Sequence, residues 1–380
     1  MALPPDEVMD WPRVSPQPVL PNYSGANLRG LVPALLAPRG ATRPGWMPAA
    51  VATAQQVVLL VVDGLGWEQL QERQSLAPTL SAMAGGPITS VAPSTTATAL
   101  TSITTGLTPG EHGLVGYRIE VAGDVLNVLR WYGSHGDARR QVLPSSTQPF
   151  VPFMGEGVAV VSKAELESSA FSEAHLRGCE PVGYRTASGL PVTIGNLLRR
   201  GDRFVYAYYD GIDKIAHERG FGQFYDAELR AVDRLIADTV AVLPPGAVLL
   251  VTADHGQVHV GDAIVTPHLE VLRSCRHQSG EGRFRWLHAK PGAHADLLAA
   301  AVEHHGHHAW VHSRADLIER GWFGPTVSPP VAARYGDVAL VPFEPISFDD
   351  PADTGAFPLV CRHGSLTSAE MLVPLLAATG

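Results

Sequence analysis

The sequence predicts an α/β fold with a mostly parallel central sheet, helices on both of its faces and a smaller inserted lobe. Three observations support this prediction. Apolar runs alternate with helix-like segments along much of the chain, as in folds built from strand–helix–strand units. The runs are almost continuously hydrophobic, which is typical of parallel strands buried on both faces. Several runs end in acidic or imidazole side chains, and ligands collect at the carboxyl ends of such strands.

The expected elements follow one another from residue 57 onward. Strands are expected at residues 57–63, 88–91, 157–162, 204–209 and 247–253. Helices are expected from residue 67, over 96–104, from 163, over 224–243 and around 293–304. Glycine and proline between these segments favour tight turns, of which residues 64–66 are the first.

Changes in composition divide the chain into three parts. Residues 1–50 are rich in proline and glycine and are expected to form an arm that packs over the core. Within this arm, residues 22–28 could reach the site, although wrapping is the favoured role. The catalytic core is expected over residues 51–265 and 343–380, and the inserted lobe over 266–342. The chain is expected to return to the core at residues 357–361.

Charge and cysteine content restrict the class of protein. The net charge of −9 and the lack of a basic stripe argue against a nucleic-acid-binding surface, but leave a nucleotide substrate open. The isolated cysteines Cys179, Cys275 and Cys361 favour a reducing cytoplasm over a disulfide framework. Cys361 is better explained as a small buried residue than as a ligand. The sequence shows no secretory signal and no apolar run near the roughly 20 residues that span a bilayer.

Seven side chains stand at the ends of apolar runs or in turns and are of types that bind metals. They are Asp63, Thr96, Asp213, His217, Asp254, His255 and His363. Buried acids and imidazoles cost several kcal/mol unless they have partners. Their repeated placement at strand ends therefore predicts a two-metal hydrolytic site with a threonine nucleophile.

Each part of this set has a simpler alternative. Asp213 and His217 share one face of a helical turn, but such a pair is usually a surface contact. Asp254 and His255 diverge at a strand end and could bind from two directions, although a polar turn is the alternative. The mixture of carboxylates and imidazoles favours Zn²⁺, with Mn²⁺ next.

Thr96 stands at the start of a predicted helix, after Pro93. An ordinary helix cap is its commonest role. The free amide groups of a helix N-terminus also attract anions, and coordination to a metal can activate a weak hydroxyl nucleophile. Phosphoryl transfer would use both properties.

The order and spacing of these motifs resemble the alkaline phosphatase superfamily and, within it, the type I phosphodiesterase/nucleotide pyrophosphatase family. The matching stretches are residues 61–66, 93–96, 105–113, 213–217, 254–256 and 363–364. The resemblance runs from about residue 55 to the C-terminus and omits the lobe. It implies a phosphoric ester hydrolase that acts on a small phosphorylated substrate, with a nucleotide as one candidate.

The resemblance also implies a role for each residue. One metal would be held by Asp213, His217 and His363, and the second by Asp63, Asp254 and His255. Thr96 would be the nucleophile and would reach the second metal. The family pattern has an asparagine three positions after the nucleophile, and Ala99 stands there. Loss of such an oxyanion donor costs about 2.7–4 kcal/mol.

Three hypotheses remain open at this point. A phosphodiesterase is favoured because no arginine motif for a monoester dianion lies near Thr96. A phosphomonoesterase or phosphonate hydrolase on the same site is the nearest alternative. A catalytically weak metal-binding scaffold is the alternative of another class, and the oligomeric state is left open.

Other motifs are weaker candidates. His112 is expected to be a structural turn residue. The tract at residues 304–308 is expected to be a solvated helix end because no acidic partner accompanies its histidines. Four residues of the expected lobe could contact an anionic leaving group: Arg283, Arg285, Trp286 and His288. An amphipathic strand explains the same residues equally well. A stacking platform could come from three aromatic residues, although core packing is favoured: Tyr117, Trp131 and Tyr132.

Overall fold

The computed structural model describes residues 16–38, 40–355 and 358–380. The first part of the arm and residue 357 of the expected return segment lie outside the described residues. Within them, no helix has both the length and the apolar character needed to cross a membrane.

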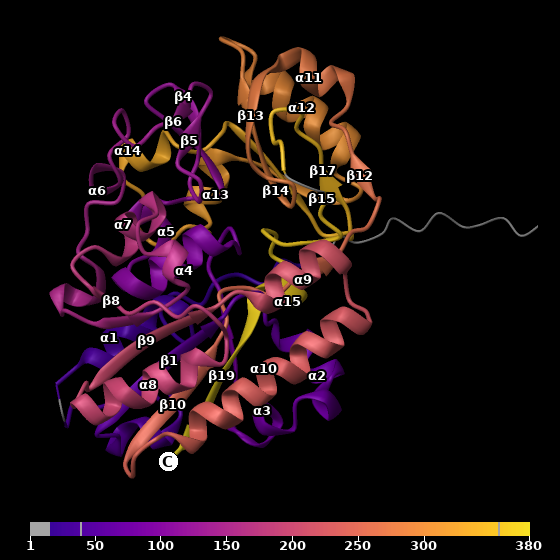
Figure 1. Ribbon diagram of the computed structural model, residues 1–380. Coiled ribbons are helices and arrows are strands. Elements are labelled where there is room, and N and C mark those ends of the chain that lie inside the picture. Colours follow the sequence, from indigo (N-terminus) through magenta and orange to yellow (C-terminus); the bar gives the residue numbers. More distant parts are fainter. Residues whose placement is uncertain (1–15, 39, 356–357) are drawn as a thin grey trace, which may run out of the picture.

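A seven-stranded sheet forms the centre of the molecule (Figure 1), with the order β2-β19-β10-β1-β9-β7-β8. Its strands are β1 Gln56–Val62, β2 Ala84–Thr89, β7 Ala159–Val161, β8 Glu180–Pro181, β9 Phe204–Tyr209, β10 Ala247–Thr252 and β19 Leu372–Thr379. Strand β19 is antiparallel to both neighbours, and the other strands run in one direction. The fold is therefore the mostly parallel α/β architecture that the sequence predicts.

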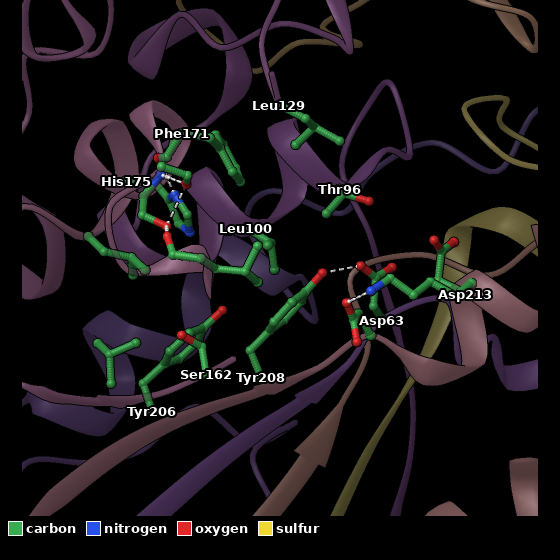
Figure 2. A pocket seen from close by; sticks show the side chains of 17 residues that line it. Asp63, Thr96, Leu100, Leu129, Ser162, Phe171, His175, Tyr206, Tyr208 and Asp213 are labelled. Carbon is green, nitrogen blue, oxygen red and sulfur yellow. Dashed lines mark hydrogen bonds and ion pairs between the residues drawn. The ribbon is translucent and has the colours of Figure 1, made fainter. Parts of the chain in front are cut away.

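The pairing of the central strands positions the functional residues. Val61 of β1 is paired with Thr252 of β10 on one side and with Tyr208 of β9 on the other. The residues that follow these strands consequently emerge at one edge of the sheet. Figure 2 shows this edge, with Asp63 beyond β1 and Tyr208 at the end of β9.

Two groups of helices cover the sheet (Figure 1). In one group, α3 (Pro78–Ala82), α8 (Gly189–Arg200) and α9 (Gly211–Arg219) all pack against α10 (Gln223–Ala241). In the other group, α1 (Leu31–Leu36) and α7 (Ala170–Leu176) pack against α4 (Thr96–Thr105). Helix α2 (Trp67–Glu72) follows the turn after β1 and contacts β19.

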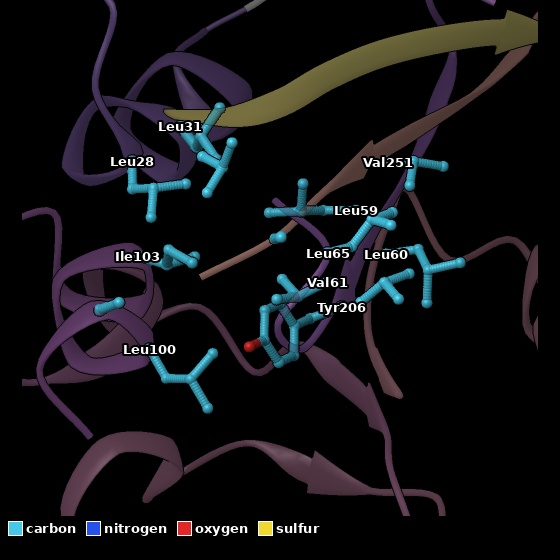
Figure 3. Close-up of a cluster of buried hydrophobic side chains, with 14 of the residues drawn as sticks. Leu28, Leu31, Leu59, Leu60, Val61, Leu65, Leu100, Ile103, Tyr206 and Val251 are labelled. Carbon is cyan, nitrogen blue, oxygen red and sulfur yellow. The ribbon is translucent and has the colours of Figure 1, made fainter. Parts of the chain in front are cut away.

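The hydrophobic core joins the arm to the sheet (Figure 3). Leu28 and Leu31 of the arm are fully buried with Ile103 of α4 and Leu59 of β1. The Asn27 amide donates hydrogen bonds to the carbonyl oxygens of residues 89 and 90, at 3.1 and 2.7 Å. These contacts place residues 27–31 on the core, and the division of the chain into arm, core and lobe stays a prediction.

A second sheet of four strands lies apart from the central sheet (Figure 1). Its order is β13-β14-β16-β15, and its strands are β13 Cys275–Glu281, β14 Phe284–Ala289, β15 Ala309–Ser313 and β16 Val338–Pro342. Helices α11 (Leu269–Ser274) and α12 (His294–His305) pack together beside it and share a separate hydrophobic core with it. This sheet lies in the segment expected to form the lobe.

Several elements differ from the sequence-based expectation. Strand β2 begins at Ala84 rather than at residue 88, because it is an outer strand where glycine and Pro87 are tolerated. Strand β19 was not expected. A third sheet was also not expected; it consists of β3 Arg118–Val121, β4 Asp124–Asn127, β5 Tyr132–Gly133 and β6 Gly136–Asp137. The helix expected from residue 163 is interrupted: a 3₁₀ helix covers Ala164–Leu166, and α7 begins at Ala170, where the Ser169 hydroxyl accepts from the Ser172 amide.

Short strand pairs connect the second sheet to the core. Strand β12 (Ile264–Val265) is parallel to β17 (Ser347–Phe348), and β11 (Val258–His259) is antiparallel to β18 (Cys361–Arg362). The β11–β18 pair brings the chain back to the carboxyl edge of the central sheet. His363 follows directly.

Candidate active site

The structure brings all seven predicted side chains to one edge of the central sheet. Asp63 follows β1, and Asp254 and His255 follow β10. The other four come from the start of α4, from α9 and from the turn after β18: Thr96, Asp213, His217 and His363. Figure 2 shows that the side chains of Asp63, Thr96 and Asp213 lie around a common space.

The first group of ligand-type atoms is deeply buried. It contains Asp63, Asp254 and His255, whose donor atoms lie within 4.8 Å of one another. His255 Nε2 lies 3.5 Å from Asp63 Oδ1 and 3.4 Å from Asp254 Oδ2. The Thr96 hydroxyl lies 3.1 Å from the same His255 nitrogen. Thr96 therefore borders this group.

The second group contains Asp213, His217 and His363. Asp213 and His217 are four residues apart on α9, and His217 Nε2 lies 3.2 Å from Asp213 Oδ1. His363 Nε2 lies 3.9 Å from the same oxygen. The two groups adjoin each other, because the rings of His255 and His363 stack with centroids 3.6 Å apart.

Backbone carbonyl groups orient all three imidazoles in the same way. His217 Nδ1 lies 2.7 Å from the Cys361 carbonyl oxygen, and His363 Nδ1 lies 3.1 Å from the Ser94 carbonyl oxygen. His255 Nδ1 lies 3.0 Å from the carbonyl oxygen of the following glycine. A carbonyl oxygen can only accept, so each Nδ1 donates, and each Nε2 faces carboxylate oxygens and is the nitrogen available to a metal ion. That arrangement suits a cation between them.

The charges of the site are not balanced by basic side chains. Within the described residues, the ion-pair partners of Asp63, Asp213 and Asp254 are all histidines. Burial, followed by the charges of Asp254 and Asp213, raises the pKa of Asp63 well above its usual value. Burial also raises the pKa of Asp213. One buried oxygen each of Asp63 and Asp254 has no hydrogen-bond partner. The residues present therefore fit divalent cations.

Neighbouring residues that sequence reasoning missed hold the carboxylates in place. The Tyr208 hydroxyl donates to Asp63 Oδ2, and Gln257 Nε2 donates to Asp213 Oδ1 at 2.8 Å. Asp254 Oδ1 accepts from the backbone amide of Gly64 at 3.1 Å. Gln257 follows His255 by two positions, so its closeness to the motif was a usable signal. Tyr208 lies inside an apolar run and carried no such signal.

Thr96 lines two cavities. The first has a volume of about 280 Å³ and a mostly apolar wall (Figure 2) that includes Leu100, Leu129 and Phe171. The second has a volume of about 600 Å³. Its wall is more polar and includes Tyr117, Arg130, Glu281, Arg362 and His363. Asp213 also lines both cavities, so they meet where Thr96 and the second group of ligands lie.

The position of Ala99 corrects one expectation. Ala99 is fully buried in the hydrophobic core, and it lines neither cavity. A polar side chain at this position of α4 would therefore enter the core rather than the space beside Thr96. The expected loss of an oxyanion donor at Ala99 is wrong for this structure.

Two of the weaker candidates are structural, as expected. His112 is fully buried, and its Nε2 lies 2.9 Å from the Ser102 hydroxyl. Burial lowers its pKa to about 3, so the ring is neutral. Cys361 is buried and its thiol is free. Its backbone carbonyl, rather than its sulfur, contributes to the site by orienting His217.

The structure corrects the expectations for the lobe. Strand β14, which contains Arg285 and follows Arg283, is not amphipathic: nearly all of its residues are buried, and both arginine side chains are buried and paired with acids. The histidine tract is not simply solvated either. His305 is buried, and His304 Nε2 lies 3.1 Å from Glu270 Oε2. This acidic partner comes from α11 and could not be inferred from the tract itself.

The three aromatic candidates have different environments. Trp131 belongs to the hydrophobic core, and its indole N–H donates to the Val142 carbonyl oxygen at 2.6 Å. Tyr132 is exposed. Tyr117 lines the polar cavity beside Thr96. Tyr117 alone is positioned to meet a ligand there.

Comparisons with known proteins show what the chain resembles. The family model for type I phosphodiesterase/nucleotide pyrophosphatase matches residues 57–147 and 171–352. No curated protein sequence matches. Human ectonucleotide pyrophosphatase/phosphodiesterase 5 is similar in structure, with a TM-score of 0.64 and 15% identity over 85% of this chain and 87% of that one.

Two further solved structures carry small ligands. One is an inactive threonine-to-alanine variant of murine ectonucleotide pyrophosphatase/phosphodiesterase 5 in complex with AMP. Its TM-score is 0.63, with 14% identity over 84% of this chain and 87% of that one. The other is phosphonoacetate hydrolase from Sinorhizobium meliloti in complex with phosphonoformate. Its TM-score is 0.61, with 16% identity over 86% of this chain and 90% of that one.

Proposed function

The chain belongs to the type I phosphodiesterase/nucleotide pyrophosphatase family, and from that premise we propose that it hydrolyses phosphodiesters with Thr96 as nucleophile beside two divalent ions. Membership of this family makes the protein a metal-dependent phosphoric ester hydrolase. The attacking group, the number and kind of metal ions and the preference for diesters are the proposal.

The position of the Thr96 hydroxyl carries the proposal. It lies 3.1 Å from His255 Nε2, on the wall that both cavities share with Asp213. Thr96 is also the first residue of α4, whose first internal hydrogen bond runs from the Ala99 amide to the Thr95 carbonyl oxygen. The backbone amides of residues 96–98 precede that bond, and such amides at a helix N-terminus favour an anion.

Two sets of residues would hold the metal ions. Asp63, Asp254 and His255 would bind one ion, and Asp213, His217 and His363 would bind the other. Bound ions would act as Lewis acids that lower the pKa of the Thr96 hydroxyl and offset the charge that develops on phosphorus-bound oxygens. Zn²⁺ is the proposed metal because the donors are imidazole nitrogens and carboxylate oxygens, and Mn²⁺ is the alternative.

The proposed reaction has two displacements at phosphorus. The Thr96 oxygen forms a bond to phosphorus while the bond to the leaving ester oxygen breaks, and the hydroxyl proton passes to solvent. Water then attacks the phosphoryl-threonine from the opposite side. The bond from phosphorus to the Thr96 oxygen breaks, and that oxygen regains a proton.

The two cavities support a diester over a monoester. A phosphodiester carries two organic groups on phosphorus, whereas a monoester carries one. Two cavities meet at Thr96, so each group would have its own space. The mostly apolar cavity would take one group, and Arg130 and Arg362 of the polar cavity would favour an anionic second group, such as the phosphate of a nucleotide.

A phosphonate hydrolase is the second candidate. The phosphonoacetate hydrolase that resembles this fold was solved with phosphonoformate, in which a carboxylate accompanies the phosphonate. Arg130 and Arg362 line the cavity beside Thr96, and a carboxylate is a natural partner for a guanidinium. A small carboxylated phosphonate would fill the polar cavity and leave the apolar one free.

Hydrolysis of two chromogenic esters and of phosphonoacetate, the last followed by phosphate release, tests the proposal. A nitrophenyl phosphodiester, the corresponding monoester and phosphonoacetate would each be incubated with the Zn²⁺-loaded protein and with Thr96→Ala. We expect the highest kcat/KM for the diester and its loss in the variant. A preference for the monoester or for phosphonoacetate would reject the diesterase assignment, and an active Thr96→Ala would reject the nucleophile.

A further inference from the structure

A third group of ligand-type side chains lies outside the active site. Glu120 comes from β3, His277 from β13 and His288 from β14. Strands β13 and β14 form an antiparallel hairpin in which His277 and His288 are directly paired, and β3 packs against β13. The group therefore lies at the junction between the β3–β6 sheet and the second sheet, which contains β13 and β14. Three strands each contribute one side chain.

The donor atoms converge closely. Glu120 Oε2 lies 2.8 Å from His288 Nδ1 and 3.1 Å from His277 Nε2. All three donor atoms lie within 4.8 Å of one another, as in the two groups of the active site. The two imidazoles are stacked, with ring centroids 4.1 Å apart and an angle of 18° between the planes. Two rings thus point at one carboxylate oxygen from the same side.

We propose that Glu120, His277 and His288 bind a further divalent cation, Zn²⁺, at this junction. Two imidazole nitrogens and one carboxylate oxygen form a recurrent zinc-binding set. Protein sites of this type leave a further position for water. Glu120 and His277 are 21% and 31% exposed, so the ion would have access to solvent from one side, while His288 is only 4% exposed.

A second contact orients His288 for this role. Its Nε2 lies 2.8 Å from the Ser279 hydroxyl oxygen. When Nε2–H donates to that hydroxyl, Nδ1 carries the lone pair and faces Glu120 and His277. Ligating histidines typically use their other nitrogen in this way, and the contact selects the ring orientation.

One basic side chain competes for the same carboxylate. Arg276 Nη2 lies 3.4 Å from Glu120 Oε2, which is longer than either histidine contact. The Arg276 side chain is 56% exposed and can turn into solvent at little cost. A cation at the junction would therefore displace an exposed ion pair rather than a buried one.

The location gives the ion a role at the edge of the active site. Strand β13 continues from His277 to Glu281, which lines the polar cavity beside Thr96. The β3–β6 sheet carries Arg130, which lines the same cavity from between β4 and β5. An ion that joins β3 to the β13–β14 hairpin would hold these two parts of the cavity wall together.

A different histidine cluster on the lobe serves as a comparison. This surface cluster contains His268, Glu270 and His304, and two of these three side chains are exposed. It lacks the paired strands that fix the junction site. Zinc that binds to the protein adventitiously would be expected there first.

Zinc content measured by mass spectrometry at buffered free Zn²⁺ tests the proposal. The wild type would be compared with His277→Gln, the surface-cluster variant His304→Gln and the control His294→Gln, which alters an exposed histidine of the same lobe. We expect His277→Gln to hold one equivalent fewer than the wild type, and the other two variants to match it. The difference is independent of how many ions the active site holds.

A second variant and a folding check keep the outcome clear. Glu120→Gln should lose the same equivalent, and the circular dichroism of each variant should match that of the wild type. Unchanged zinc content in folded His277→Gln and Glu120→Gln would overturn the proposal. A loss confined to His304→Gln would assign the extra ion to the surface cluster and would overturn it equally.

Discussion

The edge of the central sheet and the β13–β14 hairpin both bury charged side chains, but they balance them differently. At the hairpin turn, Arg283 donates two hydrogen bonds of 2.8 Å to the carboxylate of Glu370, which precedes β19, and both side chains are fully buried. At the sheet edge, Asp63 and Asp254 are buried, and His255 is their only ion-pair partner among the residues that the structure describes. The charge of the first pair is balanced by an arginine, whereas the carboxylates of the second set face an imidazole.

This difference distinguishes structural charge from functional charge. Arg285 of β14 is a second buried arginine with acidic partners, since Asp350 and Asp353 lie 3.5 and 3.7 Å from its guanidinium nitrogens. Breaking such a pair leaves an uncompensated buried charge and destabilises the fold. Adding a cation to the sheet edge would instead relieve repulsion among carboxylates and create a reactive site. The following predictions test or sharpen this comparison.

The largest expected effect is the loss of turnover in Thr96→Ala. Removal of the proposed nucleophile should lower kcat for a chromogenic diester by about 10⁴-fold or more, by analogy with other nucleophile deletions. Metal content and thermal stability should stay close to those of the wild type. Thr105→Ala, at the other end of α4, is the matched control and should remain active. Comparable rates for the two variants would contradict the assignment.

The buried Arg283–Glu370 pair should dominate stability rather than activity. Glu370→Gln leaves Arg283 without its counter-charge, so we expect the free energy of unfolding to fall by about 3–5 kcal/mol. Urea denaturation measures this change. The double variant Arg283→Met with Glu370→Gln should recover much of the loss, because it removes the stranded charge. A single-variant cost below about 1 kcal/mol would show that the pair is not structural.

At the sheet edge, the comparable substitution Asp63→Asn should increase the stability of the metal-free protein rather than decrease it. The pKa of Asp63 is raised by burial, so its ionised form destabilises the fold as pH rises from 3.8 through the raised value. Asp63→Asn should therefore raise the melting temperature of the metal-free protein more at pH 8 than at pH 5. In the Zn²⁺-loaded protein it should lower stability, because a ligand is lost. A destabilised metal-free variant at pH 8 would refute the imbalance of charge.

Substitution of Glu281 should have the smallest effect on activity at pH 7. Burial raises its pKa to about 8, so the carboxyl group is mostly neutral at pH 7 and resembles an amide. Glu281→Gln should change kcat/KM by only about two- to threefold at pH 7, well below the cost of losing a catalytic hydrogen-bond donor. Above pH 8 the wild type should lose activity, because an ionised carboxylate would repel an anionic substrate, and the variant should not. Identical alkaline limbs of the two pH profiles would contradict this role.

The sequence predicted the parts of the fold that depend on local patterns. The apolar runs of β1, β9 and β10 were identifiable because each strand is buried on both faces and is followed by polar residues. Strand β19 was missed, since Pro374 interrupts its run and its pairing with β10 joins distant parts of the chain. Periodicity in one segment carries no information about such a partner.

The same limit applies to the candidate site. The seven ligand-type residues could be selected because they follow strands or turns, and the structure brings them together. Their catalytic and metal-binding roles stay predictions. Local reasoning failed at Ala99 and at Arg283, because the environment of each depends on packing between segments far apart in the sequence. The histidines of the lobe likewise acquire acidic partners only in the folded chain.

The stereochemical course at phosphorus tests the central claim most directly. A chiral phosphorothioate diester would be hydrolysed in isotopically labelled water, and the configuration of the product would be determined. Attack by Thr96 followed by attack of water gives two inversions, so the account predicts net retention of configuration. Net inversion would mean that water attacks phosphorus directly, and it would contradict Thr96 as the nucleophile.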